Sequence, residues 1–282
     1  MIYTYYPGCS LRGSSKEYDS STQAVFARLG IELKEIPDWI CCGASSGHSM
    51  DEILNIGLPA KTLMAAEKMG HDLAVPCAAC YNRLKYTQYS LRNEAAVRKQ
   101  MKELIDFEFK DSVEILNLLE VLAMNGGVET VVSHVVKSLS DLKAACYYGC
   151  LLIRPQEVTH FDDPEHPGIL DEYVRAVGAE PVPWSYKSEC CGGSLSLTRD
   201  DIVINLVDDI IEMAREAGAH IITTLCPLCM ENLDLRQSKE KMPILYFTEL
   251  LGLAFGIKES EDWMHKHMND PTQVLQSLDI LS

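Results

Sequence analysis

The sequence predicts an α/β fold made of two similar halves, each with a mostly parallel β-sheet flanked by helices. Two observations lead to this prediction. One cysteine pattern occurs twice with matching flanks, and short apolar strands alternate with helical segments in both halves. We expect a first repeat at residues 1–135, a second at 141–257 and a C-terminal extension at 258–282.

The cysteines define the repeat. The first half contains Cys9, then Cys41-Cys42-Gly43, then Cys77-x-x-Cys80. The second half contains Cys150, then Cys190-Cys191-Gly192, then Cys226-x-x-Cys229. In both halves 34 residues separate the adjacent pair from the Cys-x-x-Cys element, an agreement that chance does not readily produce. An internal duplication is therefore the main organisational signal.

The flanking residues repeat as well. Tyr6-Pro7-Gly8-Cys9 matches Tyr147-Tyr148-Gly149-Cys150, and Ile115-Leu116 with Glu120 resembles Ile244-Leu245 with Glu249. The halves differ by insertions. The second has eight extra residues between its first two cysteine elements, around 161–167, and the first has a long polar helix expected over 84–109. Residues 126–142 connect the halves.

The predicted elements place the cysteines at strand ends. Short buried strands are expected at 2–6, 73–75, 144–148 and 221–225, each running into a cysteine element. Helices over 16–29 and 170–177 each end at a glycine, and Ser49-x-x-Glu52 and Thr198-x-x-Asp201 resemble capping boxes at helix starts. Ligands bind at the carboxyl ends of parallel strands, so each half is expected to gather its five thiols there.

Composition limits the class of protein. The chain has 282 residues, of which 47% are hydrophobic and 23% charged, as in globular proteins with a core. No uncharged apolar run approaches the roughly 18 residues of a membrane span. The N-terminus lacks the features of a secretory signal, so a cytoplasmic location is expected. The net charge of −16 argues against nucleic acid as a partner.

Eleven cysteines without an export signal indicate metal ligation more than disulfides. Soft thiolates select zinc or iron–sulfur clusters, and a Cys-x-x-Cys pair alone is typical of zinc or a redox dithiol. A zinc site leaves the other cysteines of each repeat without a role. Adjacent cysteines point to different sides of an extended chain, which suits a multi-iron cluster better. Cys146 has no counterpart in the first half and is interpreted as a buried structural thiol.

The duplicated pattern resembles the cysteine-rich CCG domain, and a chain made of two such domains resembles the B-type subunit of heterodisulfide reductase. The resemblance implies two pseudo-symmetric Rossmann-like repeats, each binding a non-cubane [4Fe-4S] cluster with five cysteines. It implies one cluster on Cys9, Cys41, Cys42, Cys77 and Cys80, and the other on Cys150, Cys190, Cys191, Cys226 and Cys229. In that family, known from methanogenesis, the disulfide of coenzyme M and coenzyme B is cleaved between the clusters.

The resemblance also implies partners. The chain has no G-x-G-x-x-G fingerprint after a strand, so electrons are expected from another protein. In the family this is a C-type, ferredoxin-like iron–sulfur subunit, fed by an A-type flavoprotein subunit and by a hydrogenase or formate dehydrogenase. We expect the partner to dock near one cluster or around Trp263 and Met264 in the C-terminal extension.

Coenzyme-type substrates are anionic, so cations are expected near the clusters. The first candidates are Lys187 and Arg199, which flank the second adjacent cysteine pair, followed by Arg12, Arg154 and His48. A solvated surface charge is the alternative for each of them.

Two other functions remain open at this point. CCG domains also occur in electron-transfer subunits of flavin-linked oxidoreductases that act on lactate, glycolate, glycerol-3-phosphate or succinate. A zinc-stabilised binding module belongs to a third class. The complete, duplicated ligand set favours a catalytic oxidoreductase that acts on a small-molecule disulfide.

Overall fold

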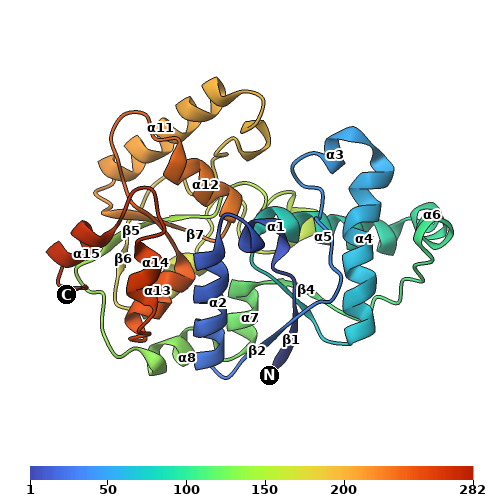
Figure 1. Cartoon of the computed structure of the whole chain (residues 1–282), viewed down its shortest axis with the longest axis horizontal. Helices are drawn as coiled ribbons and strands as arrows, with labels where there is room; N and C mark the ends of the chain where they lie inside the picture. Colours follow the sequence, from blue (N-terminus) through green and yellow to red (C-terminus); the bar gives the residue numbers. More distant parts are fainter. Residues whose placement is uncertain (282) are drawn as a thin grey trace.

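The computed structural model describes residues 1–281 and contains two four-stranded parallel sheets (Figure 1). The first sheet has the order β2-β1-β3-β4, with bounds Glu32–Glu35, Ile2–Tyr5, Leu73–Val75 and Ile115–Asn117. The second has the order β6-β5-β7-β8, with bounds Glu180–Pro181, Lys143–Tyr147, Ile221–Thr224 and Ile244–Tyr246. The two orders are the same permutation of the chain, which confirms the predicted α/β fold with two repeats. The predicted repeat bounds remain a prediction.

Helices connect the strands and cover the sheets. The α-helices of the first half and the connection are α1 Gly8–Arg12, α2 Lys16–Arg28, α3 Gly47–Met50, α4 Glu52–Met69, α5 Ala78–Asn93, α6 Ala95–Ile105, α7 Leu118–Met124 and α8 Gly127–His134. Those that follow are α9 Gln156–Thr159, α10 Ile169–Ala176, α11 Asp200–Glu216, α12 Pro227–Leu235, α13 Phe247–Ala254, α14 Ser260–Met264 and α15 Thr272–Ser277, with a 3-10 turn η1 at Gly193–Leu195.

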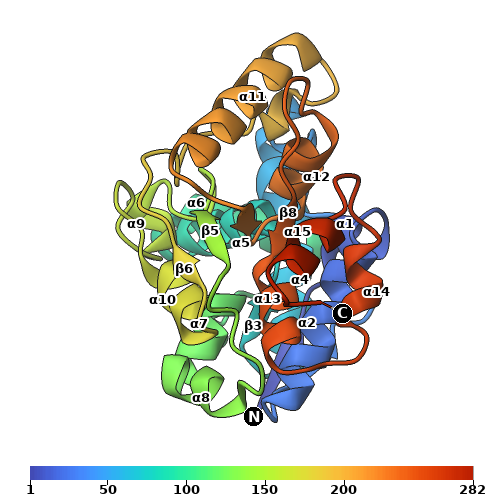
Figure 2. The same cartoon turned by 90° about the vertical axis from the view of Figure 1, so that its left-hand side faces the viewer.

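The two repeats pack against each other through helices. Helix α2 of the first half packs on α13 of the second, and α10 of the second half packs on α8 beside α7 of the first (Figure 2). The Tyr173 hydroxyl donates to the Leu119 carbonyl at 3.5 Å, and the Tyr18 ring stacks on Tyr246 with centroids 3.9 Å apart. Each repeat thus buries its first long helix on a helix near the end of the other, an arrangement of pseudo-twofold symmetry.

Both strands that precede a Cys-x-x-Cys element are buried along their whole length. β3 pairs with β1 through Thr4 and Leu73, and β7 pairs with β5 through Ala144 and Ile221. A strand that is buried on both faces has a continuous apolar sequence, and this pattern allowed the positions of both strands to be predicted. Observed and predicted strand ends differ by no more than one residue.

The predicted capping boxes are wrong. Ser49 lies inside α3, and α4 is capped instead by Asp51, whose carboxylate accepts from the Ile53 N–H at 2.7 Å. The Thr198 hydroxyl donates backward to the Leu195 carbonyl, and α11 begins at Asp200 without a side-chain cap. Ser49 belongs to the short helix α3, and the Thr198 hydroxyl is bonded to the last residue of η1, so neither side chain caps the helix that follows.

The long polar helix expected over 84–109 is also wrong in detail. It begins at Ala78, directly after Cys77, and breaks at Glu94 into α5 and α6. Glu94 has extended backbone angles and is the N-cap position of α6. The break lets α6 fold back beside α4 and α5.

The C-terminal extension is packed onto both repeats. Trp263 and Met264 are buried, and the Trp263 indole N–H donates to Ser20 on α2 at 3.1 Å. Backbone N–H groups of Met268 and Asn269 donate to Asp234 at 2.7 and 3.0 Å. The chain itself covers the Trp263 and Met264 side chains, and the docking of a partner on the surface around them remains a prediction.

One buried ion pair fastens this extension. The His267 imidazole lies 3.1 Å from the Glu249 carboxylate, which also accepts from the Tyr246 N–H at 2.8 Å. Burial opposes the charge of His267, but Glu249, with Asp234 and Glu17, outweighs burial and raises its pKa to about 9. The pair therefore holds a protonated imidazole at neutral pH.

We expect this pair to make stability fall at alkaline pH. The folded pKa of His267 lies above the unfolded value of 6.5, so its contribution is complete below pH 6.5 and is lost as the pH rises through about 9. The contribution is on the order of 3 kcal/mol, since each pKa unit corresponds to about 1.4 kcal/mol. Urea unfolding at pH 6, 8 and 10 measures it. His267→Gln should flatten this dependence. His265→Gln, which removes the exposed pair with Asp270, should leave it unchanged, and the opposite ranking would contradict the assignment.

Candidate metal centre

Each half brings its five predicted cysteines to the carboxyl ends of its strands. Cys9 lies in α1 directly after β1, and Cys77 is the N-cap residue of α5 directly after β3. Cys226 holds the same place before α12, after β7. The adjacent pairs Cys41-Cys42 and Cys190-Cys191 lie in loops that follow β2 and β6. The strand ends of a parallel sheet meet at one edge, so three separate segments of each half converge there.

The sulfur pairs are the same in both halves. In the first, Cys42 and Cys80 have their sulfurs 3.2 Å apart, and Cys9 and Cys41 lie 3.9 Å apart. In the second, Cys191 and Cys229 lie 3.5 Å apart, and Cys150 and Cys190 lie 3.7 Å apart. The repeated chain therefore repeats the side-chain geometry, not only the spacing.

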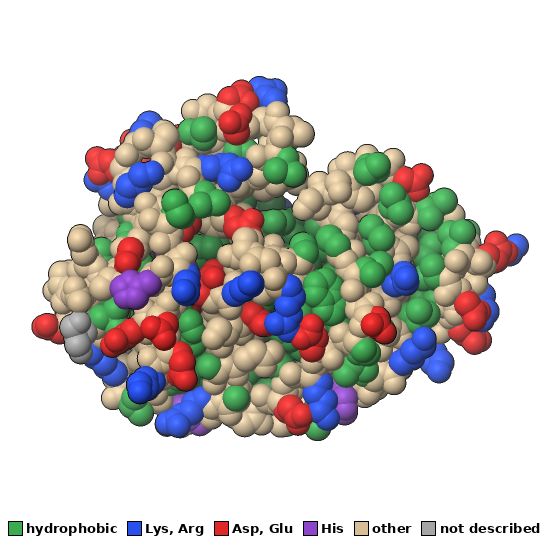
Figure 3. Space-filling view, viewed as in Figure 1, with side chains coloured by type: hydrophobic (Ala, Val, Ile, Leu, Met, Phe, Trp, Pro, Cys, Tyr) green, Lys and Arg blue, Asp and Glu red, His purple; other side chains and the backbone are tan. Residues whose placement is uncertain are grey.

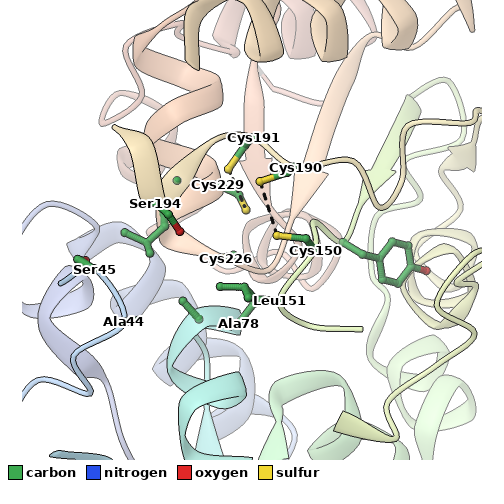
Figure 4. Close-up of a pocket in the computed structure, with 14 residues that line it drawn as sticks. Ala44, Ser45, Ala78, Cys150, Leu151, Cys190, Cys191, Ser194, Cys226 and Cys229 are labelled. Atoms are coloured by element: carbon green, nitrogen blue, oxygen red, sulfur yellow. Dashed lines mark hydrogen bonds between the residues drawn. The ribbon is translucent and has the colours of Figure 1, made fainter. Parts of the chain in front are cut away.

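Each set of five cysteines is gathered at one cavity. The first cavity is lined by Cys9, Cys41, Cys42, Cys77 and Cys80, and the second by Cys150, Cys190, Cys191, Cys226 and Cys229. Figure 4 shows the second cavity, with Cys190 and Cys191 turned towards Cys150 and Cys229. Within residues 1–281 no three His, Cys, Asp or Glu side chains already converge on one ion position. The thiols surround a space instead of a point, and a space lined by five thiols fits a cluster of several metal ions.

The two cavities adjoin. Both are lined by Ala44, Ser45, Ala79 and Leu228. Cys77 and Cys226, one from each set, lie close enough for each thiol to shift the pKa of the other. The molecular surface is hollowed between the part that carries α11 and α12 and the part that carries α3 and α4 (Figure 3). The thiol sets of the two repeats thus form one continuous site.

A buried tyrosine joins the two Cys-x-x-Cys elements. The Tyr18 hydroxyl lies 3.1 Å from the carbonyl of Pro76 and 3.0 Å from that of Leu225, the residues immediately before Cys77 and Cys226. Tyr18 is fully buried on α2. It holds the starts of α5 and α12 at a fixed separation, and no sequence pattern indicates this link.

Two further tyrosines position the adjacent cysteine pairs. The Tyr6 hydroxyl donates to the Ile40 carbonyl at 2.8 Å, and the Tyr147 hydroxyl donates to the Glu189 carbonyl at 2.6 Å. Each carbonyl belongs to the residue before an adjacent cysteine pair. Each tyrosine lies three residues before the first cysteine of its repeat. The sequence shows this repeated spacing but does not by itself indicate what the tyrosines do.

Interactions between the thiols lower the pKa of Cys41, Cys190 and Cys226 and raise the pKa of the six others that respond, namely Cys9, Cys42, Cys77, Cys80, Cys150 and Cys229. A hydrogen bond from Cys42, followed by one from Cys9 and the Gly43 N–H, lowers the pKa of Cys41. Cys150 and the Gly192 N–H lower the pKa of Cys190 in the same way. Cys9, Cys41 and Cys190 are exposed, whereas the Cys-x-x-Cys thiols are buried. Deprotonated thiolates are the form that binds metal.

Glycine is required beside the last thiol of each set. Gly8 and Gly149 have φ of +70° and +66°. A Cβ at Gly8 would lie 3.3 Å from the Cys80 sulfur, and one at Gly149 would lie 3.0 Å from the Cys229 sulfur. The absence of a side chain there lets the chain turn tightly from the first strand into the thiol set.

We expect Gly149→Ala to lose iron from the second repeat. The substitution strains a positive φ, at a cost of about 1–2 kcal/mol, and displaces the Cys229 sulfur. Gly218→Ala is the matched control, because Gly218 has φ of +80° and nothing within 4 Å of its Cβ position. Iron per chain and the unfolding midpoint are measured for both variants. Equal iron in the two variants would show that the contact with Cys229 has no effect on cluster binding.

The basic residues chosen from the sequence do not line either cavity. The Lys187 nitrogen is held by Asp171 at 2.6 Å and the Pro167 carbonyl at 3.0 Å. Arg199 pairs with Asp201 at 2.8 Å, and Arg154 with Glu165 at 3.0 Å. Arg12 pairs with Asp19 and Glu35, and the His48 imidazole lies 3.2 Å from the Ser49 hydroxyl. Their role in substrate binding therefore remains a prediction, and their charges serve local contacts.

Cys146 lies apart from both sets. It is fully buried on β5 and lines neither cavity, and burial, followed by the charge of Asp171, raises its pKa. A protonated, buried thiol is consistent with the structural role predicted for it.

Fold and site together define a duplicated, cysteine-rich α/β protein with two linked thiol cavities. Residues 3–85 and 144–234 match the family described as "Cysteine-rich domain" (CCG). The chain belongs to this family of iron–sulfur electron-transfer proteins. Within residues 1–281, no helix combines the length and hydrophobicity needed to cross a bilayer.

The relatives are redox proteins. The chain is 32% identical to an 8-methylmenaquinol:fumarate reductase membrane anchor subunit of Wolinella succinogenes, over 96% of this chain and 98% of that one. It is 28% identical to the B-type subunit of a ferredoxin/F(420)H(2)-dependent CoB-CoM heterodisulfide reductase of Methanosarcina acetivorans, over 90% and 89%. It is 24% identical to a lactate utilization protein A of Bacillus licheniformis, over 82% and 90%.

The fold recurs in a solved structure of a hypothetical protein from Helicobacter pylori. The TM-score is 0.71 at 11% identity, over 95% of this chain and 52% of that one. This chain therefore spans about half the length of the solved chain, and the likeness concerns the fold alone.

Proposed function

We propose that the chain is the iron–sulfur subunit of a multi-subunit oxidoreductase that reduces a disulfide between two four-iron clusters of the non-cubane type, one held by the five cysteines of each repeat. The observation that supports this most is that two complete thiol sets line adjoining cavities, which share Ala44, Ser45, Ala79 and Leu228. Cleaving a disulfide to two thiols takes two electrons and two protons. A site with an electron source on each side suits a bond between two equivalent sulfurs.

The chain's own residues shape the space between the thiol sets. Ala78, Leu151 and Leu228 line it with apolar surface that excludes water. Ser45 and Ser194 hold equivalent positions after the two adjacent cysteine pairs, and both line the second cavity (Figure 4). Their hydroxyls offer a hydrogen-bond donor from each repeat. The clusters, when bound, supply the two electrons.

The residues that line the two cavities also limit which substrates can bind there. No Lys, Arg, His, Asp or Glu side chain of the described residues lines either cavity. A buried anionic group without a cation is costly. We infer that the part of the substrate near its sulfurs is uncharged, and that any sulfonate or phosphate of a coenzyme M–coenzyme B heterodisulfide would have to remain outside the cavity.

Oxidation of reduced viologen dye under anaerobic conditions tests this proposal. The substrates are the coenzyme M–coenzyme B heterodisulfide, an uncharged dialkyl disulfide and a menaquinone analogue. We expect dye oxidation with disulfides, and a higher kcat/KM for the uncharged one. If the menaquinone analogue oxidised the dye and neither disulfide did, the proposal would be overturned and the second candidate below would be supported.

The second candidate is an electron-transfer subunit of a flavin-linked oxidoreductase of the fumarate, succinate or lactate type. It is favoured by the 32% identity to a fumarate reductase subunit over nearly the full length of both chains, and a cavity without fixed cations also suits a quinone ring. In either function the chain acts within a multi-subunit complex. We propose that the direct electron donor is a ferredoxin-like subunit, supplied in turn by a flavoprotein.

A further inference from the structure

The two repeats differ at the position three residues after the last thiol of each set. Arg83 lies on α5 three residues after Cys80, and Asn232 lies on α12 three residues after Cys229. Residues three apart share one face of a helix. Arg83 therefore lies on the face of α5 that presents Cys80, whose sulfur contacts Cys42 at 3.2 Å.

Asn232 is a neutral hydrogen-bond donor to its thiol set. Its side-chain nitrogen donates to the Cys191 carbonyl at 3.0 Å and to the Cys191 sulfur at 3.6 Å. Its oxygen accepts from the Ser196 hydroxyl at 2.8 Å. The residue is buried and its polar atoms are satisfied without any charge.

Arg83 brings a full positive charge to the equivalent place. Its guanidinium donates to the side-chain oxygens of Asn55 at 3.1 Å and Asn82 at 2.6 Å, and it lies 5.6 Å from the centre of the Tyr86 ring. All three neighbours are uncharged. Across residues 1–281 no carboxylate lies within ion-pair distance of Arg83, whereas each of the three arginines chosen from the sequence has one.

A partly buried arginine without a carboxylate needs another anion. Burial lowers the pKa of Arg83, and the charge of Cys42 opposes this effect. Arginine nevertheless remains protonated at any physiological pH. A cluster bound by several thiolates carries net negative charge, which grows by one when it is reduced. The first repeat therefore offers this charge a fixed cation three residues after its last thiol. In the second repeat the arginine on the matching face, Arg236, lies seven residues after Cys229 and donates to the Ser196 carbonyl at 3.1 Å.

We propose that Arg83 makes the cluster of the first repeat the more easily reduced of the two. A positive charge close to a cluster in a site of low dielectric stabilises the reduced form more than the oxidised form and raises the reduction potential. Asn232 donates one neutral hydrogen bond and raises the potential of its cluster less. This inference rests on the proposed cluster in each repeat. It predicts that the first electron reduces the cluster of the repeat that contains Arg83.

Redox titration of the full chain, followed by electron paramagnetic resonance, tests the inference. The signals are assigned to each repeat with Cys42→Ala and Cys191→Ala, and iron is measured in every sample. We expect Arg83→Gln to lower the midpoint potential of the first cluster, with a much smaller effect on the second. Arg83→Lys, which keeps the charge, should retain most of the wild-type potential.

The control is Arg92→Gln on the same helix. Arg92 pairs with Asp111 and Glu114 and lies twelve residues after Cys80, near the far end of α5, so both potentials should stay unchanged. Equal shifts of both clusters in Arg83→Gln, no shift, or loss of the first cluster in both Arg83 variants would overturn the inference alone. Wild-type protein without iron would instead overturn the proposed function, and the inference with it.

Discussion

Replacing Cys42 or Cys191 by alanine is expected to remove one cluster and leave the other, so that iron falls from about eight to about four per chain. Both cysteines are buried, and each contacts the last thiol of its Cys-x-x-Cys element, at 3.2 and 3.5 Å. Neither cavity offers another thiol that could take the place of the missing one. Iron analysis of anaerobically purified protein, with circular dichroism to establish folding, measures the effect.

Cys146→Ala is the matched control. Cys146 is also buried, but it lines neither cavity, so this variant should keep all of its iron. Loss of iron from a well-folded Cys146 variant would contradict the ligand sets. Wild-type protein containing zinc and no iron would contradict the proposed cofactor altogether.

The second large effect concerns turnover. Either single variant is expected to abolish disulfide reduction, and the double variant should be no worse than either one. The reason is that the two cavities adjoin and have four lining residues in common, so that a bound disulfide would meet both thiol sets at once. Residues that act as one unit show such non-additivity. The assay is dye-driven disulfide reduction with each variant at matched concentration.

A relay predicts another outcome. If the clusters passed electrons in sequence to a substrate at one of them, loss of the distal cluster would block the natural donor but not a small dye. Substantial dye-driven activity in Cys42→Ala or Cys191→Ala would therefore exclude the two-sided site and support the electron-transfer candidate.

Much of the architecture was predictable because duplication constrains both halves at once. Equal spacing from the adjacent cysteines to the Cys-x-x-Cys element predicted equal topology, and the two sheets have the same strand order. Strands that are buried on both faces are short apolar runs that end at the cysteines, so their positions could be predicted from the sequence. The starts of α2 and α10 were also predicted to within one residue. The capping residue of α4 was not, because Asp51 competes locally with Ser49 for the same backbone donors and only the folded chain selects one.

The cations show the limit of a sequence argument. Lys187 and Arg199 were chosen for their nearness in sequence to Cys190, yet Asp171 and Asp201 hold them away from the cavities. Arg83 was not chosen, although it lies beside the first thiol set without a carboxylate. Nearness along the chain does not say on which side of a helix or loop a long side chain points.

The sequence by itself determined the duplication, the α/β class, the membership of each thiol set and the separate character of Cys146. These depend on spacing and on local hydrophobic pattern, which the chain carries residue by residue. Only the tertiary structure decided that the two thiol sets adjoin and that Tyr18 joins them. It also decided that no lysine or arginine of residues 1–281 lines the cavities and that Arg83 lies near the first set without a carboxylate partner. These features arise from packing between segments far apart in sequence, and the free energy of such packing depends on side chains that meet only after both repeats have folded.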